Sequence, residues 1–242
     1  MIFKYKFSME TKSNKNEVIV IGTIHSQHLN NEDYGLSNLK AIIESLKPDV
    51  VLAEIPPDRF KIAQGESNET GIIKEPRVLQ YPEFSKVVFP LQKEMNFQLF
   101  PVSAWTEEMA NTRERKLTAI SKDPNRQEDW YLYLDAREET SRLFEKANKG
   151  LNPVWVHSNE FDTIMNIELQ VFDELFNDDL GAGGWTNINN AHYSLINNKL
   201  SSFKDSGKRI LIMFGAGHKG WLKNKLKPRT DIKLVDLLDA LT

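Results

Sequence analysis

The chain has 242 residues, of which 40% are hydrophobic and 27% charged, and its formal net charge is -3. This composition is ordinary for a globular protein and argues against a disordered chain, while the dispersed acidic and basic residues disfavour nucleic acid as a partner. The sequence has no cysteine, which excludes disulfides, thiolate metal ligands and a cysteine nucleophile.

The N-terminal residues have no apolar stretch of the kind found in secretory signals, and no segment approaches eighteen consecutive apolar residues. We therefore expect a cytoplasmic protein with no membrane partner. The polar tract from Glu10 to Glu17 is expected to be a disordered lead-in. The sequence leaves the oligomeric state open.

Two buried strands are predicted near the N-terminus. The apolar run VIVIG predicts a strand over residues 17–22 that leads into Gly22-x-x-His25, and VVLAEI predicts a second over residues 49–55. Between them, residues 31–46 place apolar side chains at helical spacing, and Pro48 ends this helix. A strand, a helix and a strand in this order predict a right-handed parallel crossover.

A helical insertion is predicted in the middle of the chain. A third short strand is expected near residues 97–102, and from about 105 to 206 the sequence becomes polar with helical periodicity. Within two apolar stripes of this insertion lie Arg137 and Glu168. Either each charge lies at the edge of its stripe, or the two form a pair facing a cleft beneath the helices.

The strand pattern returns near the C-terminus. The run ILIMFG predicts a buried strand over residues 209–215 that leads into Gly215-x-x-His218, and IKLVDLL predicts a last strand or a passage from strand to helix. We therefore predict one α/β domain over residues 1–242, formed by both ends of the chain. Its central sheet is expected to be mixed but largely parallel and flanked by helices, with residues 105–206 as a helical cap.

The strand ends predict a metal site. Because the carboxyl ends of parallel strands meet at one edge of a sheet, His25, Glu54 and His218 are expected to lie close together. Two imidazoles and a carboxylate are a common ligand set for divalent manganese, zinc, cobalt or iron, and they leave a position open for an activated water. In the alternative interpretation the histidines only bond backbone groups at the strand ends.

Further residues are candidates for substrate binding. Arg113 or Arg115, after the third strand, could bind a carboxylate or phosphate, although a solvated helix face also explains them. His192 lies in a polar helical segment that either folds over the sheet edge or lies on the surface. His28 is either a partner of the site or a loop histidine, and His157 has no assigned role.

Three motifs together resemble the TraB/GumN/Tiki superfamily, which includes erythromycin-esterase-like and ChaN-like proteins. They are GTIH at 22–25, VVLAEIPP with Glu54, and FGAGHKGWLKNKL at 214–226. The resemblance implies that His25, Glu54 and His218 surround a central cleft. Many relatives also have an Arg-Asn pair on a late helix. Here the matching stretch is Asn189-Asn190, which makes Asn190 a candidate for substrate binding.

The activities known in this superfamily diverge, so three functions are considered. The leading hypothesis is a metal-assisted hydrolase that cleaves a peptide, ester or related acyl bond in a peptide or small molecule, with Glu54 and His25 as catalytic residues. The second is a protein that binds haem, iron or a small molecule without turnover. The third is a metal-independent esterase, in which His25 activates water and Glu54 orients it.

Overall fold

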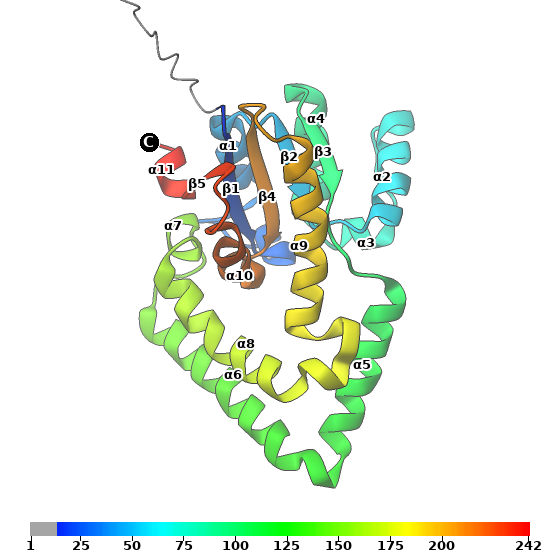
Figure 1. Ribbon diagram of the computed structural model, residues 1–242, viewed down its shortest axis with the longest axis vertical. Helices are drawn as coiled ribbons and strands as arrows, with labels where there is room; N and C mark the ends of the chain where they lie inside the picture. Colours follow the sequence, from blue (N-terminus) through cyan, green and yellow to red (C-terminus); the bar gives the residue numbers. More distant parts are fainter. Residues whose placement is uncertain (1–13) are drawn as a thin grey trace, which may run out of the picture.

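The computed structural model describes residues 14–242 (Figure 1). The strands are β1 (Asn16–Thr23), β2 (Val50–Ala53), β3 (Gln98–Pro101), β4 (Arg209–Gly215) and β5 (Ile232–Val235). The α-helices are α1 (Leu36–Leu46), α2 (Pro57–Thr70), α3 (Pro76–Leu79), α4 (Phe89–Met95), α5 (Glu107–Lys122), α6 (Gln127–Ala147), α7 (Pro153–Val156), α8 (Asn159–Leu180), α9 (Trp185–Ser202), α10 (Ala216–Leu226) and α11 (Leu237–Ala240). Four short 3-10 or π turns complete the described chain: η1 (His25–Leu29), η2 (Phe84–Val88), η3 (Pro124–Arg126) and η4 (Gly181–Gly183).

The strands form one five-stranded sheet in the order β3-β2-β4-β1-β5. Every pairing within residues 14–242 is parallel, so the predicted α/β class is confirmed and the sheet that we expected to be mixed is parallel throughout. The central neighbours are β1 and β4, with Gly22 opposite Phe214 and Thr23 opposite Gly215. The two Gly-x-x-His segments therefore leave adjacent strands at the same edge of the sheet.

Helices cover both faces of the sheet, which explains why the strands are continuously apolar. Along β1, Ile19 and Ile21 face a core shared with α1 and α4, whereas Val18 and Val20 face a core shared with α9 and α10. Successive side chains of a strand point to opposite faces, so both sets of residues are buried. The sheet is thus a rigid support for the segments that follow its strands.

The insertion predicted for residues 105–206 is helical and comprises α5 to α9. Figure 1 shows α5, α6 and α8 extending beyond the carboxyl edge of the sheet, and α9 returning to pack beside β4. A small core of Ile120, Phe172, Phe176 and Leu180 holds the far part of the insertion together. No helix within residues 14–242 is long and apolar enough to cross a membrane.

One local expectation needs correction, and the structure favours one of the two interpretations of Arg137 and Glu168. The polar tract was expected to be disordered as far as Glu17, but Asn16 and Glu17 belong to β1; residues 10–13 of the tract lie outside the described residues. In the described part of the chain Arg137 and Glu168 form no ion pair within 4.0 Å, and Arg137 is exposed with its guanidinium over the Tyr133 ring at 5.7 Å. This favours the interpretation that each charge lies at the edge of its apolar stripe. Glu168 is half-buried, and this burial raises its pKa.

Candidate active site

His25 follows β1 and forms a dyad with a buried glutamate. Its backbone has φ 49°, in the left-handed region, which turns the chain sharply out of the sheet. Its Nδ1 lies 2.7 Å from Oε1 of Glu83, a fully buried residue just before η2. Because a carboxylate only accepts, Nδ1 carries the proton and Nε2 keeps its lone pair.

The dyad also changes the titration of His25. Burial alone would lower the pKa of the imidazole, but the hydrogen bond to Glu83 and the charges of Glu83 and Glu54 outweigh burial and raise it. His25 is therefore protonated over a wider pH range than a free histidine.

Glu54 directly follows β2 and is held between neighbouring strands. Its backbone N–H donates to the Met213 carbonyl at 3.0 Å, and its Oε2 accepts from the Gly215 N–H at 2.7 Å. Burial raises the pKa of the carboxyl to about 7, although the charge of His25 and the Gly215 hydrogen bond both oppose the rise. Glu54 can therefore gain or lose a proton near neutral pH.

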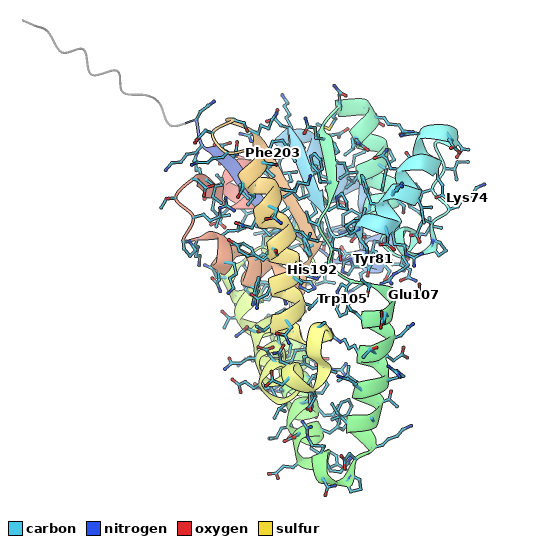
Figure 2. All side chains as sticks on the ribbon, turned by 45° about the vertical axis from the view of Figure 1, so that its right-hand side comes forward. Lys74, Tyr81, Trp105, Glu107, His192 and Phe203 are labelled. Atoms are coloured by element: carbon cyan, nitrogen blue, oxygen red, sulfur yellow. The ribbon has the colours of Figure 1, made fainter. Side chains whose placement is uncertain are left out.

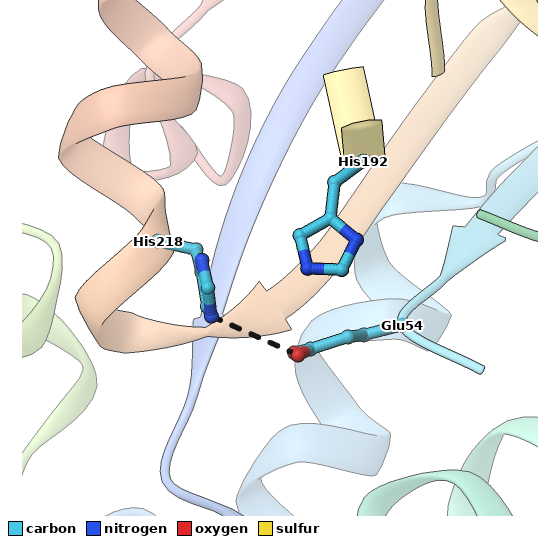
Figure 3. A group of neighbouring side chains, drawn as sticks. All are labelled: Glu54, His192 and His218. Carbon is cyan, nitrogen blue, oxygen red and sulfur yellow. Dashed lines mark ion pairs between the residues drawn. The ribbon is translucent and has the colours of Figure 1, made fainter. Parts of the chain in front are cut away.

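His218 lies in the first turn of α10 and presents an unprotonated nitrogen to Glu54. The amide orientation of Asn189 is fixed because its Nδ2 donates to the Trp185 carbonyl at 2.8 Å. Its Oδ1 therefore accepts from Nδ1 of His218, at 2.7 Å, and Nε2 of His218 keeps its lone pair. This Nε2 lies 3.8 Å from Oε1 of Glu54, a contact marked in Figure 3. Burial holds the pKa of His218 well below its ordinary value, so the ring is neutral.

His192 is fully buried on α9, and its ring carries its proton on the other nitrogen from that of His218. The Ala104 backbone N–H donates to Nδ1 at 2.8 Å. Because burial lowers the pKa of His192 to about 4, the ring is neutral, and its single proton must therefore be on Nε2. This Nε2 has no hydrogen-bond partner within residues 14–242, and Figure 3 shows His192 directed towards Glu54 and His218.

Glu54, His192 and His218 form a group that could hold a metal ion. One ligand atom from each residue lies within 4.8 Å of the others, and the group is largely buried. We call it the Glu-His-His triangle. His25, the first histidine of the predicted ligand set, is not in the triangle, whereas His192 is.

The donor atoms of the triangle fit a metal only in part. Glu54 supplies a carboxylate oxygen, and His218 supplies a neutral nitrogen whose ring is oriented by Asn189, as ligating histidines usually are. His192 does not fit in its present form, because Nε2 carries the proton while the Ala104 amide occupies Nδ1. Coordination by His192 would require it to release this hydrogen bond, which leaves a backbone N–H unpaired.

A pocket of about 610 Å³ opens beside this group, and we call it the apolar pocket. His25 and His218 line it together with a few other polar residues, Thr23, Gln27 and Glu145. Most of its apolar walls come from the helical insertion, including Phe144, Trp155, Phe161, Met165 and Trp185. Trp185 also stacks on the His218 ring at 4.7 Å between centroids. The volume and the few convergent polar groups are typical of a site for a small organic ligand.

The remaining candidates lie in different environments. Arg113 is half-buried near the site, whereas Arg115 and Asn190 are exposed. His28 is buried rather than solvated: its Nε2 accepts from the Ile24 N–H at 3.1 Å. His157 has a structural contact, because its Nε2 accepts from the Gly22 N–H at 3.0 Å.

Two contacts of the site were missed in the sequence. Glu83 lies in a segment with no strand ending or recognisable motif, so nothing marked it as the partner of His25. Asn189 entered the sequence analysis only as the first residue of the Asn189-Asn190 stretch that matches the superfamily's Arg-Asn pair, and Asn190 was taken as the candidate for substrate binding. The helical spacing of three between Asn189 and His192 places both on one face of α9, and this spacing was a usable signal.

Comparisons of the chain with protein-family models, with curated proteins and with solved structures each found no match. The resemblance to the TraB/GumN/Tiki superfamily therefore rests on the three sequence motifs. The structure itself defines an α/β protein with a five-stranded parallel sheet and a buried group of one glutamate and two histidines at the carboxyl edge.

Proposed function

We propose that this protein is a hydrolase that cleaves an acyl bond, either an ester or an amide, by attack of a water bound in the Glu-His-His triangle. The observation that carries the proposal is the arrangement of protons there. His192 offers an N–H donor, His218 offers an unprotonated nitrogen, and Glu54 offers a carboxyl whose pKa is about 7. Two acceptors and one donor complement the hydrogen-bonding groups of a single water molecule.

In the proposed reaction Glu54 is the general base. The water accepts a hydrogen bond from Nε2 of His192 and donates to Nε2 of His218 and to the Glu54 carboxylate. Its oxygen then bonds to the carbonyl carbon of the substrate while one proton moves to Glu54. Because His218 stays neutral, it orients the water without competing for the proton.

His25 is the proposed general acid. It lies beside the triangle, its pKa is raised, and it lines the apolar pocket where a substrate would bind. When the tetrahedral intermediate collapses, the bond between the carbonyl carbon and the leaving oxygen or nitrogen breaks, and protonated His25 gives its Nε2 proton to that atom. Glu54 then releases the proton that it took from water, and His25 regains one, so that the site returns to its starting state.

The pocket and the sequence motifs support a proposed class of substrate. The walls of the apolar pocket fit an aliphatic or aromatic acyl group of a small molecule or a peptide. The resemblance to a superfamily with ester- and peptide-cleaving members supports hydrolysis rather than another reaction. As in the leading sequence hypothesis, Glu54 and His25 are the catalytic residues; the position of Glu54 in the triangle and its pKa of about 7 support its role as the general base.

Metal-assisted hydrolysis is the second candidate, and the orientation of His218 by Asn189 favours it. A divalent ion would supply a Lewis acid and a more acidic bound water. Glu54 and His218 would hold it as they stand, but His192 would have to change its tautomer. No step of the proposed reaction passes through a metal.

The test is hydrolysis of methyl 4-(octanoyloxy)benzoate, which is measured through the methyl 4-hydroxybenzoate that it releases. We expect protein dialysed against EDTA to hydrolyse this ester with the same kcat/KM as untreated protein. Loss of activity with EDTA and recovery with Zn²⁺ or Mn²⁺ would establish the metal-assisted candidate instead. No hydrolysis, together with a Soret band when haem is titrated, would establish binding without turnover.

Substitution of Gly215 by Ala is expected to reduce this activity by about tenfold or more, because misplacing a catalytic group costs rate steeply. An added Cβ would lie 2.5 Å from Nε2 of His25, so the imidazole must move. The backbone of Gly215 has φ -50° and ψ 140°, which alanine adopts without strain, so the effect is steric.

Gly65→Ala is the matched control for this substitution. Nothing lies within 4 Å of a Cβ at Gly65, and the residue is inside α2, so activity is expected to be unchanged. Full activity in Gly215→Ala would show that His25 does not act from its present position.

A further inference from the structure

A second pocket borders the candidate site and contains two arginines. Its volume is about 550 Å³, and we call it the arginine pocket; Arg77, Tyr81, Trp105, Arg113 and Trp130 contribute to its lining. It shares no lining residue with the apolar pocket.

Two rings of the arginine pocket pack against histidines of the site. Tyr81 contacts His25 edge-on at 4.7 Å between ring centroids, and Trp105 contacts His192 edge-on at 6.4 Å. Figure 2 shows Trp105 near His192, just before the start of α5. His25 thus lines the apolar pocket directly and borders the arginine pocket through Tyr81.

Arg113 is a half-buried cation, and no residue of the described chain forms an ion pair with it. Its guanidinium donates to the Gly183 carbonyl at 3.3 Å and lies over the rings of Phe172 and Trp105, at 4.9 and 5.5 Å. Within residues 14–242 no carboxylate oxygen lies within 4.0 Å of Arg113 or Arg77, in contrast to Arg59, which contacts Glu107 at 2.8 Å.

A desolvated guanidinium without a counter-ion is costly unless a ligand supplies the negative charge. Glu114 also lines the pocket, but it is exposed and forms no ion pair with either arginine within 4.0 Å. Of the three charged residues that line the pocket, the two arginines are therefore cations left without a counter-ion within 4.0 Å in residues 14–242.

We infer that the substrate carries an anionic group on its leaving portion, which binds Arg113 and Arg77 in the arginine pocket while the acyl portion fills the apolar pocket. This inference rests on the proposed function, because it assigns the two pockets to the two sides of the bond that is cleaved. A carboxylate or a phosphate fits the planar, bidentate donors of arginine. The leaving atom would then lie beside His25, which is the proposed acid.

The test uses a ligand that cannot be hydrolysed, so that binding is measured separately from catalysis. The anionic ligand is 4-(octyloxy)benzoate, and the neutral comparison is its methyl ester; both contain an ether in place of the scissile ester. We expect calorimetry to show that wild type binds the acid about tenfold more tightly than the methyl ester. Equal affinity for the two ligands would overturn the inference.

Variants at two positions of α5 localise the anion site. Arg113→Gln is expected to lose the preference for the acid, and Arg113→Lys to keep only part of it, because lysine retains the charge but not the fork of donors. Arg115→Gln is the control: Arg115 is exposed on the same helix, and among residues 14–242 its side chain donates only to Thr112, so the preference should persist. A preference that survives in a folded Arg113→Gln variant would show that the arginine pocket is not the anion site.

Failure of the anion site and failure of the proposed hydrolysis give different results. Hydrolysis of methyl 4-(octanoyloxy)benzoate without any preference for the anionic ether would remove the anion site and leave the hydrolase. An Arg113-dependent preference for the anionic ether without any ester hydrolysis would support the anion site and remove the hydrolase.

Discussion

Glu54→Gln is expected to lower the rate of ester hydrolysis by about 10²–10⁴-fold, because it removes the proposed general base. The same substitution is expected to make the folded protein more stable above neutral pH. Glutamine has nearly the same shape and still accepts the Gly215 N–H, which glutamate accepts at 2.7 Å. Loss of activity with a gain of stability would separate a catalytic carboxylate from a structural one.

The stability effect has a definite pH dependence. The pKa of Glu54 is about 7 in the folded protein, compared with an ordinary value of 4.5. Between these values the folded state holds a proton that the unfolded state has released, so stability falls as pH rises from 4.5 through 7. At about 1.4 kcal/mol for each unit of pKa shift, the ionised carboxylate destabilises the fold by up to about 3 kcal/mol at pH 8.

Thermal midpoints of wild type and Glu54→Gln at pH 5 and pH 8 check this prediction. The variant should unfold at a higher temperature than wild type at pH 8, and this difference should shrink at pH 5. Glu114→Gln, which changes an exposed carboxylate, should show no such pH-dependent difference. If the thermal midpoints of variant and wild type differ by the same amount at both pH values, the substitution acts through packing and not through the ionisation of Glu54.

Glu83→Gln is expected to reduce hydrolysis at neutral pH by about 10–10²-fold, because a smaller fraction of His25 is protonated and able to act as the general acid. Glutamine can still accept a hydrogen bond from Nδ1 of His25, but it removes the negative charge, 2.7 Å away, that helps to raise the pKa of His25. The pKa of His25 should therefore fall, and the alkaline limb of the profile of kcat/KM against pH should move to lower pH.

Titration of His25 by NMR is the direct readout for Glu83→Gln. Glu75→Gln is the control, since Glu75 is also buried but lies near Arg59 rather than His25. We expect the control to leave the titration of His25 unchanged. If His25 titrates at the same pH in Glu83→Gln as in wild type, Glu83 has no electrostatic role.

The sheet could be predicted because its signal is local. Strands buried on both faces require continuous apolar runs, and the observed bounds of β1 and β4 lie within one residue of the predicted ranges 17–22 and 209–215. The expectation that both Gly-x-x-His segments reach one edge is confirmed by the pairing of Thr23 with Gly215.

The site could be predicted only in part because its remaining residues depend on packing between distant segments. The polar sequence around His192 suggests a surface helix, yet α9 packs this face against β4 and α10 and buries His192 fully. Glu83 reaches His25 across 58 positions of the sequence, and no local pattern indicates the contact. Which nitrogen of each histidine carries the proton depends on the Ala104 amide and on Asn189, and the sequence does not show these partners.

The proposed hydrolysis depends most on the proton of His192, because that proton decides whether the Glu-His-His triangle binds a water or a metal. The nitrogen chemical shifts of the His192 ring, measured by NMR with and without Zn²⁺, test it most directly. We expect a protonated Nε2 and an unprotonated Nδ1, with both shifts unchanged when Zn²⁺ is added. An unprotonated Nε2 that shifts on addition of Zn²⁺ would contradict the account and identify His192 as a metal ligand.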